Sequence, residues 1–147
     1  MSEIFFSSVL KPEQRENLES LLFFNPLQRT IESSILKSLD HFGPPEISSD
    51  NGKLNIRVRE LPDLQTLFAF ERSGEGDREL IGAILYFRTD SAKITVLHVA
   101  VREDYCVFRK PGRMLVRALL SELRRIARLI KGVEWITTSY TGRTIRV

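Results

Sequence analysis

Residues 93–140 read KITVLHVAVREDYCVFRKPGRMLVRALLSELRRIARLIKGVEWITTSY, and this stretch decides the fold. Segment 93–101 is mostly apolar, which predicts a strand. Over 112–131 the apolar residues fall within a narrow arc of the helical wheel, which predicts a long amphipathic helix. Segment 134–140 predicts one more strand. Because a strand, a crossover helix and a strand form a βαβ unit, we expect the two strands to run parallel in one sheet.

Three more strand patterns precede this unit. Apolar and polar residues alternate over 54–58, as in a half-buried strand, and apolar segments follow at 67–70 and 80–87. The residues up to Gly52 are rich in Ser, Asp, Asn and Gly and are typical of a loop. The connections from one strand to the next are short. These strands and 93–101 are therefore predicted to form an antiparallel meander of about four strands.

The N-terminal part is predicted to hold two helices, over 12–24 and 26–41. The chain has 147 residues, of which 42% are hydrophobic and 28% are charged, so it is globular and has the size of one ordinary domain. The predicted fold class is α/β (α+β), as a single domain over 1–147. Four aromatic residues are predicted to lie in its core: Phe68, Phe70, Phe87 and Trp135.

The composition bears on the cellular compartment, on metal binding and on membrane association. Cys106 is the single cysteine, which excludes an internal disulfide framework and favours a reducing cytoplasm. One cysteine and two histidines disfavour a structural zinc site. No apolar run approaches the roughly 20 residues that span a bilayer, and the first residues lack the basic region of a signal peptide. We therefore expect a cytoplasmic protein with no metal site and no membrane association.

The net charge of +3 conceals an uneven distribution. From Val101 to the end there are 11 basic and 4 acidic residues, while the rest of the chain has an acidic excess. Positive charge concentrated in one part of a chain attracts anions. A nucleotide cofactor, a nucleic acid and an acidic protein surface are all compatible with it.

The predicted element order is two helices, a meander and then a strand–helix–strand unit. This order resembles that of the GNAT superfamily of N-acyltransferases. Three motifs carry the resemblance, LIGAIL (80–85), LHVAV (97–101) and RKPGRM (109–114), within the region 54–140. The resemblance implies an acyl-CoA-dependent enzyme. Such an enzyme transfers an acetyl group from acetyl-CoA to an amine of a small molecule or a protein.

In that family the backbone of the strand before the loop pairs with the pantetheine arm of coenzyme A, and the loop amides hold its pyrophosphate. Carried over, the resemblance assigns these residues to the cofactor: Val99, Ala100, Val101, Arg109, Lys110, Gly112, Arg113 and Met114. A helix N-terminus offers unpaired N–H groups and partial positive charge to a diphosphate, whatever the family. Met114 stands where the family has Gly or Ala, and Pro111 removes one amide donor. The alternative is an ordinary helix start with solvated basic residues.

Acid–base catalysis has two candidates. His98 lies in the middle of its strand, and by alternation it shares a face with Ile94, Val96 and Ala100. Its ordinary pKa of about 6.5 suits a general base that deprotonates an ammonium acceptor, and the alternative is a half-buried histidine bonded to a neighbouring strand or to water. Tyr140 follows the last strand, where it could donate a proton to the leaving thiolate. The alternative for Tyr140 is a surface tyrosine.

A second hypothesis is a GNAT-like module without catalysis. One face of helix 112–131 carries a row of basic residues, which is either solvated or binds a protein partner or nucleic acid through phosphates: Arg113, Arg117, Arg124, Arg128 and Lys131. The row has no aromatic residue for stacking on bases, so a role in binding single strands is disfavoured.

A third hypothesis concerns the edge of the sheet. The family continues past the last strand with another helix and another strand, whereas this chain stops soon after Tyr140. We therefore expect an exposed sheet edge, which proteins usually cover. A homodimer would cover this edge and complete the acceptor site.

Overall fold

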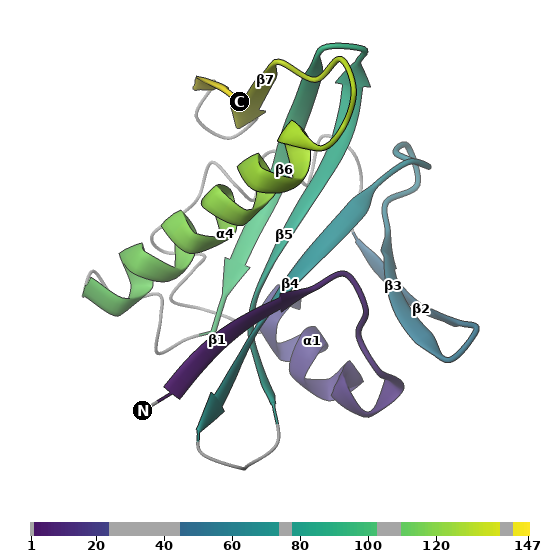
Figure 1. The fold of residues 1–147 in the computed structure, drawn as a ribbon. Helices are drawn as coiled ribbons and strands as arrows, with labels where there is room; N and C mark the ends of the chain where they lie inside the picture. Colours follow the sequence, from purple (N-terminus) through teal and green to yellow (C-terminus); the bar gives the residue numbers. More distant parts are fainter. Residues whose placement is uncertain (1, 24–44, 74–77, 103–109, 139–142) are drawn as a thin grey trace.

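The computed structural model describes residues 2–23, 45–73, 78–102, 110–138 and 143–147, and Figure 1 shows how the elements are arranged. It is a mixed α+β fold built on a curled, mostly antiparallel sheet. The elements in chain order are β1 (Ser2–Ser7), a 3-10 turn η1 (Pro12–Gln14), α1 (Arg15–Phe23), β2 (Glu46–Asp50), β3 (Lys53–Arg57), β4 (Gln65–Ser73), β5 (Glu79–Asp90), β6 (Lys93–Val101), α4 (Lys110–Arg128), β7 (Trp135–Thr138) and β8 (Thr144–Arg146). The predicted helix over 26–41 lies outside the described residues.

The main sheet has six strands in the order β1-β4-β5-β6-β7-β8. All neighbours pair antiparallel except β6 and β7, which run parallel, with Lys93 opposite Trp135 and Val96 opposite Thr138. Helix α4 makes the crossover between these two strands (Figure 1). The predicted parallel pairing of the strands on either side of the long helix is confirmed.

The strands that form the observed meander are not all the ones predicted. Strand β3 covers all of the predicted strand 54–58 except Val58, but it pairs with β2 in a separate two-stranded sheet. Segment 46–50, predicted as part of a loop, is strand β2, so that prediction is wrong. Asn51 and Gly52 turn the chain back with φ values of 52° and 73°, the left-handed backbone of the tightest hairpin turns. Strand β1, which pairs antiparallel with β4 in the main sheet, was not predicted from the sequence.

Two apolar cores cover the two faces of the sheet. Helix α4 buries Leu115, Leu119 and Leu123 against one face, and α1 buries Leu18 and Leu21 against the other (Figure 1). The spacing of the α4 leucines keeps them on one side of the helix, as the sequence predicted. Each face of the central strands is therefore covered by a helix.

Gly82 of β5 lets α4 approach the sheet closely. A Cβ atom on Gly82 would lie 3.3 Å from Leu119 Cδ1 and 3.3 Å from the Ala100 carbonyl oxygen. Those distances are shorter than ordinary contacts, so a larger residue would force the Leu119 side chain or the Ala100 backbone to shift. The glycine in the LIGAIL motif thus has a packing role in this fold.

A β-bulge interrupts the alternation of side chains between the two faces of β6. Leu85 of β5 lies opposite His98, but the next residue, Tyr86, lies opposite Val96, so Leu97 is the extra residue. An extra residue reverses the faces of all the side chains that follow it. The prediction that His98 shares a face with Val96 is therefore wrong, because Val96 belongs to the α4 core whereas Leu85, opposite His98, belongs to the α1 core.

Strand β8 pairs antiparallel with β7, with Trp135 opposite Arg146. An exposed edge after the last strand was predicted, and this is wrong for β7 because β8 pairs with it. Trp135 was predicted as core but is 38% exposed, and the Arg146 guanidinium carbon lies 5.9 Å from its ring centroid. The core side chain of β7 is its neighbour, Ile136. Phe68 and Phe70 are buried as predicted, and Phe87 is partly buried against the α1 core.

Candidate functional site

The predicted cofactor residues fall on two consecutive elements. Val99, Ala100 and Val101 are the last three residues of β6, and Lys110 is the first residue of α4. Gly112, Arg113 and Met114 also lie in the first turns of α4. Their side chains and Arg109 lie outside the described residues, so only the backbone of this helix start is placed. The N-terminus of a 19-residue helix thus follows the carboxyl end of the parallel strand β6.

The side chains at the end of β6 are buried in the two cores. Val99, Ala100 and Val101 are 4%, 0% and 6% exposed. A ligand at this end of the strand would therefore contact backbone and not side chains. Within the described residues, the register between β6 and β7 runs as far as the pair Val96–Thr138, five residues before the end of β6. On its other side β6 remains paired with β5 as far as Val101, opposite Gly82.

His98 is buried in apolar surroundings. It is 2% exposed, and its Nδ1 atom is buried without a hydrogen-bond partner among the described residues. Loss of hydration disfavours the imidazolium ion, so burial lowers the pKa of His98 from 6.5 to about 4. The ring is therefore neutral at pH 7, which is the form that accepts a proton. The burial also means that an acceptor amine must displace core side chains to reach it.

The other catalytic candidate, Tyr140, lies outside the described residues, as does Cys106. The structure therefore brings His98 together with Val99, Ala100 and Val101 on one strand and leaves the proposed acid unplaced.

The exposed face of α4 carries cationic side chains. Arg117, Arg124 and Arg128 are exposed, whereas Arg125 pairs with Glu122 at 2.5 Å, one turn earlier. Residues at positions 117, 124 and 128 fall close together around a helix, so they form one basic row. In the part of the chain that the structure describes, no helix is long and apolar enough to cross a membrane.

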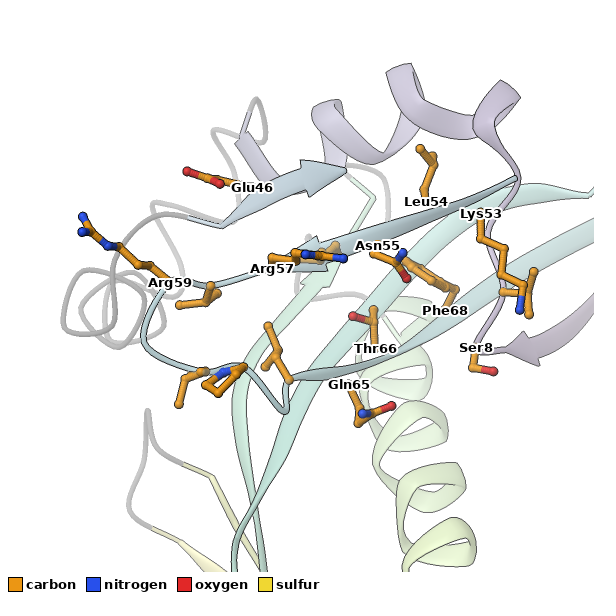
Figure 2. Close-up of a pocket in the computed structure, with 16 residues that line it drawn as sticks. Ser8, Glu46, Lys53, Leu54, Asn55, Arg57, Arg59, Gln65, Thr66 and Phe68 are labelled. Carbon is orange, nitrogen blue, oxygen red and sulfur yellow. The ribbon is translucent and has the colours of Figure 1, made fainter. Parts of the chain in front are cut away.

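A cleft that the sequence did not indicate lies between the β2–β3 hairpin and the start of β4 (Figure 2). Its volume is about 970 Å³, within the range of small-molecule sites. Polar side chains from β3, from its connection to β4 and from the start of β4 line it, including Lys53, Asn55, Arg57, Arg59, Gln65 and Thr66. The alternating polar residues of β3 were visible in the sequence. The cleft itself was not visible in the sequence, because it depends on β2 and β3 forming a sheet separate from the main one.

No protein-family model matches this chain, and no curated protein is similar enough in sequence to count as a match. The residues and the fold are therefore the basis for assigning a function.

Proposed function

We propose that the chain is an acyl-CoA-dependent N-acyltransferase of the GNAT type, which transfers an acetyl group from acetyl-CoA to an amine. One observation carries the proposal: β6, α4 and β7 form a crossover unit with parallel strands, and the helix starts after the carboxyl end of β6. The motifs LHVAV and RKPGRM lie at this strand end and this helix start. Their order along the chain, strand end and then helix start, supports the proposal.

The chemistry of the helix start supports a diphosphate ligand. The first amides of a helix lack partners within the helix and carry partial positive charge, and a pyrophosphate accepts several such donors. Gly112 in the first turn allows close approach of a ligand to the backbone. Lys110 and Arg113 supply charge in the same turn. Pro111 supplies no N–H, so the remaining amides of that turn bind the ligand.

In the proposed reaction the amine nitrogen of the acceptor attacks the thioester carbonyl carbon, the C–S bond breaks, and coenzyme A leaves as the thiol. The amine loses a proton and the sulfur gains one. His98 is the candidate base and Tyr140 the candidate acid. Because His98 is so deeply buried, we propose that the positioning of the two substrates contributes most of the rate.

Titration with acetyl-CoA tests the proposal. Binding to the native state at 100 times the dissociation constant stabilises it by about 2.7 kcal/mol, which raises the melting temperature by roughly 5–10 °C for a chain of this size. We expect Arg113→Glu, at the helix start, to abolish this shift. The matched control is Arg128→Glu at the other end of α4, about 22 Å away, and it should keep the shift. No shift with 1 mM acetyl-CoA would refute the proposal.

A second candidate function is a GNAT-like module that binds nucleic acid or a protein partner through the basic row of α4. The exposure of Arg117, Arg124 and Arg128 favours it. Phosphate contacts make binding fall steeply with salt. For this function Arg128→Glu abolishes salt-dependent binding of an oligonucleotide while acetyl-CoA produces no shift, which is the reverse of the pattern expected for the acyltransferase.

A further inference from the structure

The cleft between the β2–β3 hairpin and β4 presents a regular row of polar side chains (Figure 2). On β3, Leu54 and Ile56 are buried in the α1 core, so the alternate residues Lys53, Asn55 and Arg57 lie on the other face. Residues two apart on a strand are separated by about 6.8 Å, so Lys53 and Arg57 are about 14 Å apart along it. The row therefore has the repeat of an extended chain.

The cleft carries an excess of positive charge. Lys53, Arg57 and Arg59 line it, against the single carboxylate of Glu46. Arg57 lies 3.9 Å from Asp50, but their side chains are 64% and 58% exposed, so the pair is a weak one. Among the residues that the structure describes, neither Lys53 nor Arg59 has an ion-pair partner. Uncompensated charge in a concave site attracts anions.

The neutral part of the lining distinguishes between anions. Asn55, Gln65 and Thr66 offer amide and hydroxyl groups, which pair well with peptide backbone. Phe68 is the one aromatic side chain in the described lining, and it is 1% exposed. Recognition of single-stranded nucleic acid depends on stacking of bases on accessible aromatic rings. The lining therefore favours a peptide over a nucleic acid strand.

We propose that this cleft binds an extended acidic peptide segment of a partner protein, lying alongside β3. Carboxylates on alternate residues of such a segment repeat at about 6.8 Å, the same spacing as the side chains of β3. Two of them, four residues apart, would meet Lys53 and Arg57, and a further one would meet Arg59. The binding does not depend on acyltransferase activity, because the cleft is built on the β2–β3 hairpin and β4, and not on the β6–α4–β7 unit.

Fluorescence anisotropy with a labelled Glu-Thr-Glu-Thr-Glu-Thr-Glu peptide tests the proposal at low and high salt. We expect saturable binding that weakens as salt rises, and no binding of the same peptide with Gln in place of Glu. Loss of three exposed ion pairs should weaken binding roughly tenfold or more in the variant Lys53→Gln, Arg57→Gln, Arg59→Gln. The matched control removes the same charge from α4, Arg117→Gln, Arg124→Gln, Arg128→Gln, and should change binding less than twofold.

Absence of saturable binding, or equal weakening in the cleft and α4 variants, would overturn the proposal. So would a poly-dT strand that binds more tightly than the peptide and is lost in the cleft variant. If the triple variant does not fold by circular dichroism, Arg59→Gln alone carries the test. Arg59 is exposed and lies past the end of β3, so its replacement should leave the hairpin intact and weaken binding about threefold.

Discussion

The burial of His98 predicts that the protein loses stability as the pH falls below 6.5. In the folded state the pKa of this histidine is about 4, whereas in the unfolded chain it is near 6.5. As the pH falls, the unfolded state binds the proton first, so acid favours unfolding. The free energy of unfolding therefore has its full value above pH 6.5 and decreases progressively from pH 6.5 to pH 4.

The size of the effect follows from the two pKa values. Between pH 7.5 and pH 5, the proton taken up by the unfolded state lowers the free energy of unfolding by about 2 kcal/mol. Urea unfolding at the two pH values measures this loss. His98→Leu has nearly the same volume and nothing to titrate, so it should lose about 2 kcal/mol less than the wild type over the same range. An equal loss in the wild type and His98→Leu would refute the reasoning.

Three further predictions concern two glycines, Gly82 and Gly132, and the side chain of Arg88. Gly82→Val should lower the free energy of unfolding by about 2 kcal/mol, because its side chain would meet Leu119 and the Ala100 carbonyl; urea titration measures this, and Gly82→Ala should cost less. Gly132→Ala should cost about 1–2 kcal/mol, since Gly132 has a φ of 92° and a Cβ there would lie 3.3 Å from the Ser91 oxygen; an unchanged melting temperature would contradict this. Arg88→Met should cost about 1 kcal/mol, because Arg88 Nη2 donates to the carbonyl oxygens of Ser91 and Lys131; hydrogen exchange should speed up at the end of α4 and not at α1.

The parallel strand–helix–strand unit could be predicted because its signals are local. The leucines of α4 repeat at helical spacing, and the apolar strand β6 has the bounds that the sequence indicated. Strands β1 and β8 could not be predicted in the same way. Segment 2–7 carries two adjacent phenylalanines and segment 144–146 is only three residues long, so neither shows a clear repeat. Both are strands because a neighbouring strand offers its edge, which is a tertiary effect.

The candidate site was predictable only in part for the same reason. The positions of Val99 and Val101 at the end of β6 followed from the strand pattern. The face of His98 did not, because alternation assumes an unbroken strand, and the bulge at Leu97 appears only in the pairing with β5. The Asn51-Gly52 turn was a local hairpin signal that the polar composition of its neighbours concealed.

The bulge at Leu97 makes the core under α4 sensitive to the number of residues in β6 as well as to their type. Ile94 and Val96 precede it and Val99 and Val101 follow it, yet all four contribute to the core under α4. Exchange of one aliphatic residue for another at these positions leaves that partition intact. Removal of Leu97 itself would remove the bulge and restore plain alternation, with the same four residues still beneath α4. Removal of Thr95, outside the bulge, would instead turn Ile94 away from α4. Natural variants of this strand should therefore tolerate a change in residue number at the bulge but not elsewhere in the strand.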